Sequence, residues 1–597
     1  MFNLKSSSKL SATLLALILG ASVFMAGQVW AGKYVTDPTT GKVVTAPEYG
    51  GTLTYVNMLE PASIDPAIVL IASHAIGLVN EKLGIPNWAL DRDVHDYRTI
   101  WLPESAIIGR LAESWEMPDA TTYIFKIRKG VHWHNKAPMN GRELTASDIE
   151  YNQHRIWGLG SGFTEPAGNA PLYPYVKNSE GLLNIESVTA TDKWTVVFKL
   201  KEPILGTLKD ITVQEPNLVL APEVIEQYGD VTDWRNVVGT GPFELTDYVE
   251  GSSITYTKNP DYWGFDEKYP ENRLPYVDEI RALIMKERAT IVALMRSGKA
   301  DFIGKAGQSQ LTSVDAAMSL QRTNPELNLW PFSYFAETAM TFDNQKAPWN
   351  DIRVRQAIQM AIDLETINQT YMQGWADTTP TGPVGRALME YTTPFEEWPE
   401  EIKKTYRYDP AGAEALLDEA GYPRGADGIR FQTVYEHYEP YDLDYYLTVM
   451  EYLRAIGIGV EMEVKDRASH SALKRDPEIR QGMLTEVSNR DTPPIGSISQ
   501  AYSKAYNPPN VNDPIYDAMY VAAAAATTVE EQMRLVAEAD MYIIEKHWWI
   551  VGPRVPLFAV TQPWVIGYNG EAEFGSNDYV MLSRLWIDSE LKEAMGH

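Results

Sequence analysis

Alternation of apolar and polar residues is clearest at Val238–Gly264, where it predicts a β-hairpin. Phe243 and Leu245 alternate with polar neighbours before a glycine-containing turn, and Ile254 and Tyr256 repeat the pattern after it. A side-chain period of two is typical of a strand with one buried face. The breakers Thr-Gly-Pro and Asn-Pro mark the two ends of this hairpin.

The same period of two predicts a strand at Gly51–Val56 and a second hairpin at Leu111–Gly130. In that hairpin Tyr123, Phe125 and Ile127 share one face, opposite threonine, lysine and arginine. Both segments therefore belong to sheets that cover a core on one side.

Apolar spacings of three and four predict helices between the strands. Ile291, Leu294 and Met295 have this spacing, and Gly298 follows where a C-terminal cap is expected. The other segments predicted from the same signals are a helix capped by Asn350 or Asp351, a helix capped by Asp409 and closed by Gly421, a helix at Leu447–Ala455 and a strand at Ile458–Val464. Alternating strands and helices favour an α/β architecture.

The first 31 residues have the pattern of an export signal. Lys5 and Lys9 precede the apolar run Leu14–Met25, which is short for a membrane span, and Val29-Trp30-Ala31 suits cleavage before Gly32. We predict a signal peptide at 1–31, cleaved near Ala31, and a flexible polar leader at 32–47.

The chain has no cysteine, which excludes disulfides, thiol catalysis, thiolate metal sites and the acylated cysteine that tethers some exported proteins. We therefore expect a diffusible periplasmic protein. The formal net charge is −28, which repels nucleic acid and anionic lipid, and we exclude nucleic acid as a partner. The length of 597 residues predicts two or three domains.

Catalytic patterns are missing from the sequence. We find no G-x-S-x-G, no H-E-x-x-H and no phosphate-binding G-x-x-x-x-G-K-[ST] motif. Asp442 and Asp444 lie near Glu436 and Glu439, but a solvated acidic loop is the expected outcome for such a cluster. We predict that the protein is not an enzyme and needs no cofactor.

Several strings occur in the order of one known family. They are the opening hairpin VGTGPFELTDYVEGSSITYTKNPDYWG, Leu111–Gly130, Pro275–Ile303, Ala347–Asp363, Tyr408–Pro423 and Pro553–Val560. Together they resemble the family 5 extracellular solute-binding proteins, which are dipeptide-, oligopeptide-, nickel- and oligosaccharide-binding receptors of bacterial ABC importers. The resemblance covers essentially the whole chain after the signal.

The resemblance implies a two-lobed periplasmic binding protein of the hinge-closing type II, with an extra domain inserted in the first lobe. The expected division is 48–70 with 190–303 and 553–597 as the first lobe, 71–189 as the inserted small domain, and 304–552 as the second lobe. Such a receptor binds a solute between the lobes and delivers it to permease subunits in the inner membrane. We expect a monomer.

Nickel receptors belong to the same family, so metal binding has to be considered. His132 and His134 share a face if the chain is extended there, a spacing that can bind a transition metal. The resemblance places them on the outer turn of a small-domain hairpin, away from the ligand. We predict no metal site.

Peptide receptors of this family neutralise the peptide ammonium with an aspartate late in the second lobe. The matching stretch is Met483–Pro493, where Ser488 stands in place of that aspartate and Asp491 takes the second acidic position. Glu486 or Asp491 restores an acid if the match shifts by a few residues. We expect Ser488, Asn489 and Asp491 to contact the ligand.

The alternative ligand is an oligosaccharide, which stacks on aromatic rings and bonds to amides and carboxylates. The further residues that the resemblance places near the cleft are Asn57, Tyr334, Phe335, Trp375, Tyr435, Glu436, His437 and Tyr438. Peptide use dominates the family, so we favour an oligopeptide. An exported chaperone or adhesin with the same fold is the alternative from another class.

Overall fold

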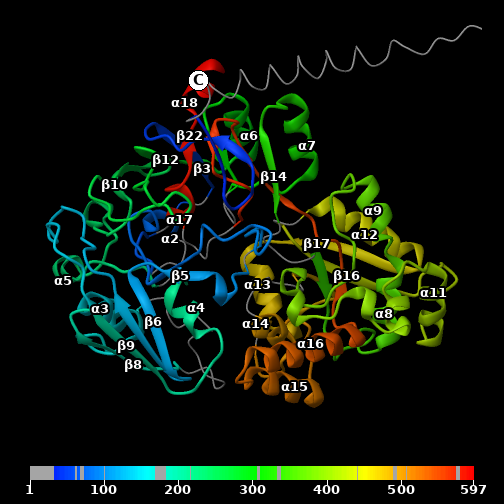
Figure 1. The fold of residues 1–597 in the computed structure, drawn as a ribbon. Coiled ribbons are helices and arrows are strands. Elements are labelled where there is room, and N and C mark those ends of the chain that lie inside the picture. The colour runs from blue at the N-terminus through cyan, green and yellow to red at the C-terminus, as the bar shows by residue number, and fades with distance from the viewer. Residues whose placement is uncertain are drawn as a thin grey trace, which may run out of the picture.

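The computed structural model describes residues 33–58, 60, 63–67, 73–99, 101–167, 183–214, 217–304, 309–332, 338–439, 442–487, 494–505, 507–572 and 578–597. The predicted signal peptide at 1–31 lies outside them. Strands and helices alternate around three larger sheets, and Figure 1 shows the part of the chain from 338 to 551 as a separate lobe at the right. The α/β prediction is confirmed.

The first lobe is built on a seven-stranded sheet. Its strands, in spatial order, are β10 (Phe243–Val249), β11 (Ser253–Lys258), β12 (Glu279–Ile284), β3 (Thr52–Asn57), β13 (Phe302–Ile303), β20 (Leu557–Thr561) and β14 (Asn328–Phe332). β12, β3 and β13 run parallel to one another, whereas β20 is antiparallel to both of its neighbours.

Both faces of this sheet are covered. Leu53 and Tyr55 of β3 belong to the hydrophobic cluster on one face, and Val56 belongs to the cluster on the other. The second cluster also contains residues of α6 (Arg288–Arg296) and α7 (Val314–Thr323). The side chains of β3 therefore contribute to two hydrophobic cores, one on each face of the sheet.

A four-stranded antiparallel sheet forms the inserted unit. Its spatial order is β6 (Ala112–Asp119), β7 (Thr122–Ile127), β9 (Thr195–Leu200) and β8 (Ile185–Asp192). The remaining elements of the unit are α3 (Ala146–Trp157), α4 (Thr207–Thr212), α5 (Pro222–Tyr228), β4 (Gly84–Pro86) and β5 (Ile107–Gly109).

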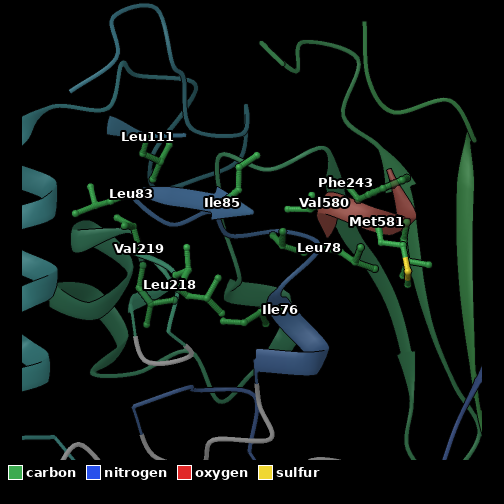
Figure 2. Packing of buried hydrophobic residues seen from close by; sticks show 14 of the residues in the cluster. Ile76, Leu78, Leu83, Ile85, Leu111, Leu218, Val219, Phe243, Val580 and Met581 are labelled. Atoms are coloured by element: carbon green, nitrogen blue, oxygen red, sulfur yellow. The ribbon is translucent and has the colours of Figure 1, made fainter. Parts of the chain in front are cut away.

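The inserted unit and the first lobe share one hydrophobic core. Figure 2 shows Leu83, Ile85 and Leu111 in one continuous packing with Phe243 of β10. Val580 and Met581 of α17 (Asp578–Leu582), near the end of the chain, complete this cluster. Short α2 (Ser73–Ile76) also packs here through Ile76. We call the first lobe and the inserted unit together the first body.

The second lobe is built on a five-stranded sheet. Its order is β17 (Ile458–Lys465), β16 (Phe431–Tyr438), β18 (Met483–Val487), β15 (Thr338–Thr341) and β19 (Ile550–Val551). Its helices are α8 (Ile352–Ala361), α9 (Leu364–Thr370), α10 (Glu400–Thr405), α11 (Pro410–Glu419), α12 (Leu443–Ala455), α13 (Arg467–Arg475), α14 (Pro494–Ile498), α15 (Pro514–Ala524) and α16 (Val529–Lys546).

Sheet membership differs from two of the predicted borders. β14 pairs with β20 in the seven-stranded sheet, so the chain enters the second lobe between β14 and β15 rather than at 304. β9 is a strand of the inserted sheet, so that unit extends beyond 190. In both cases a strand pairing over a long sequence separation decides the border, and the local pattern does not contain it.

The predicted flexible leader at 32–47 is wrong for its described residues. β1 (Tyr34–Thr36) and β2 (Val43–Thr45) form a hairpin, in which Asp37 is buried with its carboxylate 3.0 Å from Nζ of Lys268. Val35 and Val44 pack against a cluster of aromatic residues. A buried ion pair and apolar packing therefore stabilise the hairpin. The polar composition of the segment did not indicate either contact.

The other local predictions are confirmed in kind. β10 and β11 form the hairpin at Val238–Gly264, and β6 and β7 form the second one. Asp351 caps α8 by accepting from the Arg353 N–H, and Asp409 caps α11. α12 begins at Leu443, four residues earlier than predicted, because Asp442 caps it.

Two strands connect the lobes. The chain leaves the seven-stranded sheet after β14 for β15, and it returns from β19 to β20. The remaining short strands, β21 (Val565–Ile566) and β22 (Trp586–Ile587), pair with each other, and α18 (Ser589–Ala594) ends the chain. Two crossings between two lobes are typical of a hinge.

Candidate functional site

The carboxyl ends of parallel strands mark the candidate site. In the first lobe β12, β3 and β13 end at Ile284, Asn57 and Ile303. In the second lobe β17, β16 and β18 are parallel and end at Lys465, Tyr438 and Val487. Open α/β sheets bind ligands beyond such ends. The region between these two edges is therefore our candidate ligand site.

Asn57 lies at the expected edge of the first lobe. It is the last residue of β3, it is buried, and its carbonyl accepts the Met285 N–H at 2.9 Å. Its position agrees with a cleft residue, and its contact with a ligand stays a prediction.

Trp375 lies where the two lobes meet. Its ring stands edge-on to Phe558 of β20, with the ring centroids 5.5 Å apart and the planes at 74°. Two backbone hydrogen bonds beside it, of 3.0 and 2.8 Å, join Asp377 to Arg554 of the segment that returns to the first lobe. Trp375 is still 40% exposed, so part of its ring is free to meet a solute.

Tyr435 and His437 are buried in the core of the second lobe. The Tyr435 hydroxyl is 2.8 Å from the Thr485 hydroxyl, and its ring stacks on Tyr446 of α12 at 5.3 Å. The His437 ring lies 5.2 Å from the same tyrosine. This packing does not support direct contact of either ring with a solute.

Glu436 points to the opposite face of β16 and is also buried. Burial raises the pKa of its carboxyl above the usual range, and the Gln481 backbone and the Lys465 charge oppose that shift. A buried carboxylate at this position is sensitive to any nearby cation.

The five remaining predicted ligand residues are Tyr334, Phe335, Ser488, Asn489 and Asp491. All of them lie outside the described residues. Their contacts with a ligand stay predictions.

One pair of side chains at the second-lobe edge escaped the sequence analysis. The Tyr371 hydroxyl, near the end of α9, donates to Oδ1 of Asp442 at 2.7 Å. Burial raises the pKa of Tyr371, and the charges of Asp442 and Asp444 add to the shift. Tyr371 is 38% exposed. The sequence pattern could have identified Asp442 as the aspartate that caps α12, but it gives no sign that Tyr371, 71 positions away, is its partner.

Tyr438, the last residue of β16, was named as a candidate and lies at this edge. Its ring stacks on His470 of α13, with the centroids 4.5 Å apart and the planes at 16°. It is half-buried, and its N–H donates to the Thr485 hydroxyl at 3.2 Å. The edge therefore carries Tyr438 as well as the pair of Tyr371 and Asp442.

Metal chemistry finds no support among the described residues, where no group of three or more histidine and acidic side chains is placed to hold an ion. His134 is buried, with Nε2 3.0 Å from the Gly241 carbonyl oxygen and Nδ1 accepting the Gly239 N–H at 3.3 Å. Burial lowers its pKa to about 4. Both of its nitrogens are therefore engaged, and His134 has none left for a metal.

An apolar groove of about 570 Å³ lies on another part of the second lobe. It runs between α15 and α16, at the bottom of the second lobe in Figure 1, whereas α9 lies at its top. None of the residues at the strand edges lines it.

Comparison with known proteins identifies the chain. Residues 106–517 match the family model of bacterial extracellular solute-binding proteins, family 5 Middle. The heme-binding protein A of Haemophilus influenzae is 25% identical over 468 residues, 77% of this chain and 81% of that protein. The periplasmic oligopeptide-binding protein OppA of Salmonella typhimurium is 23% identical over 98% of this chain and 99% of its own length.

Solved structures support the same fold. The periplasmic binding protein DppA of Helicobacter pylori, in complex with the peptide STSA, superposes with a TM-score of 0.66 at 20% identity. The match covers 91% of this chain and 99% of DppA. Relatives of this kind are solute-binding receptors of ABC importers, not enzymes. The chain belongs to the family 5 bacterial extracellular solute-binding proteins and is a receptor of that class.

Proposed function

We propose that this receptor binds a short peptide between its two lobes and delivers it to the permease of an ABC importer. The observation that carries the proposal is the second-lobe edge, where the exposed ring of Tyr371 adjoins the carboxylate of Asp442. A peptide offers an ammonium for the carboxylate and side chains for the ring. The oligopeptide-binding protein of Salmonella, similar along nearly the whole chain, favours the same ligand class.

The proposed contacts come from both edges. Asp442, held by Tyr371, neutralises the peptide ammonium, because burying that charge without a counter-charge costs several kcal/mol. Trp375 covers an apolar part of the ligand, and Asn57 approaches it from the first lobe. Tyr334, Phe335, Ser488, Asn489 and Asp491 complete the proposed set.

The proposed setting is the periplasm. The 1–31 segment acts as the signal, and cleavage near Ala31 leaves the hairpin of β1 and β2 close to the new N-terminus. No helix of the described residues has the length and apolar character needed to cross a membrane. The proposed receptor works as a monomer with the permease as its partner. Mass spectrometry of the exported protein tests the cleavage site.

Calorimetric titration of the exported protein tests the ligand class. The panel contains dipeptides to pentapeptides, the same peptides acetylated at the N-terminus, and oligosaccharides of two to five units. We expect free peptides to bind and to raise the melting temperature, since ligand at 100 times Kd adds about 2.7 kcal/mol of stability. Acetylation removes the ammonium, so it should weaken binding at least tenfold.

Binding of oligosaccharides without peptides would overturn the peptide proposal and favour the exposed rings of Trp375 and Tyr371 as sugar platforms. Absence of saturable binding by both classes would favour a chaperone or adhesin. A matched pair of variants locates the ammonium site. Asp442→Asn should weaken free peptides but not acetylated ones, whereas the exposed Asp119→Asn in the inserted unit should change neither.

A further inference from the structure

A short segment of the first body reaches into the core of the second lobe. Leu102 is only 3% exposed and belongs to the core of the first body. Its neighbour Trp101 packs instead against a hydrophobic cluster of the second lobe. Every other residue in that cluster comes from positions between 339 and 549. Adjacent side chains of an extended segment point in opposite directions, which explains this division.

The contact of Trp101 is specific in geometry. Its ring meets Tyr391 edge-on, with the centroids 6.2 Å apart and the planes at 74°. Tyr391 is 5% exposed, and burial raises its pKa to about 12, aided by the charges of Glu390, Glu104 and Glu530. Glu104 belongs to the first body, so its carboxylate lies near this tyrosine of the second lobe.

Trp101 is held from its own side too. Nζ of Lys209, on α4 of the inserted unit, lies 4.6 Å from the centre of the Trp101 ring. Every residue of α4 is buried, so this ammonium is well fixed. A buried cation over a tryptophan face and an edge-on aromatic pair are both stabilising contacts. The ring therefore lies between a group of the first body and a group of the second lobe.

This contact is separate from the hinge. The hinge contacts are those of Trp375 with Phe558 and of Asp377 with Arg554, next to the strands that cross between the lobes. Trp101 comes from the loop before β5, and Tyr391 ends the short 3-10 helix Arg386–Tyr391. Hinge bending leaves the first set in place, whereas it separates the surfaces that Trp101 and Tyr391 join through their side chains.

We infer that Trp101 is a positioning residue for solute capture, which stabilises the closed arrangement of the lobes without touching the solute. The inference rests on the proposed function, because it assumes that the lobes close when the receptor binds its solute. Apparent affinity falls in proportion to the closed fraction of the free receptor. Removing the ring should therefore weaken every ligand by the same factor, about 3- to 10-fold.

The experiment uses the full exported protein and fluorescence transfer between two labels. Because the chain has no cysteine, Glu116→Cys on β6 and Glu531→Cys on α16 give unique, exposed labelling sites. We expect the ligand-free Trp101→Ala variant to show lower transfer efficiency than the labelled protein that keeps Trp101. Titration with a dipeptide and a tetrapeptide should give the same fold-increase in Kd for both.

Trp194→Ala is the matched control. Trp194 is also half-buried with a lysine over its ring, Lys193 Nζ at 4.5 Å, but among the described residues it packs against the core of the first body and not against a cluster of the second lobe. We expect it to leave transfer efficiency and Kd unchanged. Tyr391→Leu should reproduce the effect of Trp101→Ala, and the double variant should add nothing further.

Equal transfer efficiency in Trp101→Ala and in the unsubstituted protein would overturn the inference. A Kd change for one peptide length alone would also overturn it, since Trp101 would then contact the ligand. If no peptide binds to the unsubstituted protein, the proposed function fails. The transfer measurement on the ligand-free receptor still decides the role of Trp101 in that case.

Discussion

The two bodies of the molecule are organised differently. In the first body one hydrophobic cluster contains Phe243 of the seven-stranded sheet and Phe198 of the inserted sheet. The second lobe has separate clusters, one with Tyr435 and α12 and another with Tyr516 and α16. The inserted unit therefore cannot move freely against the first lobe, because separation would expose a shared core. Hinge bending is therefore expected between the first body and the second lobe, not between the inserted unit and the first lobe.

The largest expected effect comes from breaking a buried charge network that belongs to the first body alone. Glu81 is buried and accepts from Nε of Arg110 at 2.8 Å, from the Tyr262 hydroxyl at 2.8 Å and from the Thr240 hydroxyl at 3.0 Å. Arg110→Ala leaves this carboxylate without its cation. We expect a loss of about 3–5 kcal/mol in the free energy of unfolding.

Hydrogen exchange with mass spectrometry locates that loss. Protection should fall across both the inserted sheet and the seven-stranded sheet, and it should persist in the five-stranded sheet. The control is Arg534→Ala on α16, which removes an exposed pair with Glu538 and should cost less than about 0.5 kcal/mol. Loss confined to the inserted sheet would contradict the shared core.

Acid should destabilise both bodies, through one buried histidine in each. Burial lowers the pKa of His134 to about 4 in the first body and that of His547 to about 3 in the second lobe. The unfolded chain binds these protons near pH 6.5, before the folded chain does. Stability is therefore complete above pH 6.5 and falls as the pH drops toward 4, by about 3 kcal/mol for His134.

Urea denaturation at a series of pH values measures this effect. His134→Asn should remove the part of the pH dependence that belongs to the first body. The exposed neighbour His132→Asn is the control and should leave the slope unchanged. A slope that is the same in all three proteins would show that carboxylates alone control the acid response.

The smallest effect separates core from ligand contact in the second lobe. Tyr435→Phe removes the hydroxyl that bonds Thr485 and leaves the ring in place. We expect a loss of about 1 kcal/mol in stability and no change in peptide Kd. Trp375→Ala, at a 40% exposed ring, should change Kd instead. Weaker binding by Tyr435→Phe at unchanged stability would restore that tyrosine to the ligand site.

Local sequence signals predicted the helices and strands well. They did not predict how strands that are far apart in the sequence pair with one another. The hairpin of β10 and β11 and the caps Asp351 and Asp409 follow from residues that are neighbours in sequence. The placement of β14 beside β20, and the burial of Asp37 by Lys268, depend on residues more than 200 positions apart. No periodicity contains such information.

The candidate site was predicted less well than the fold. Tyr435 and His437 were placed near the cleft by resemblance, and the structure buries both on a strand whose two faces are covered, so their contact with a ligand stays a prediction. Tyr371 was missed because its partner Asp442 comes from another helix. The resemblance predicted that Asn57 and Trp375 lie near the cleft, and the structure then showed which residues surround them.

The position of β20 has a consequence for the order of assembly. This strand, Leu557–Thr561, lies between β13 and β14, both of which precede it by more than 200 residues. A ribosome or an export channel releases the chain from its N-terminus, so the gap between those two strands stays open until the last 40 residues or so emerge. Until then the receptor has no continuous first-lobe sheet, because β13 and β14 have no strand between them.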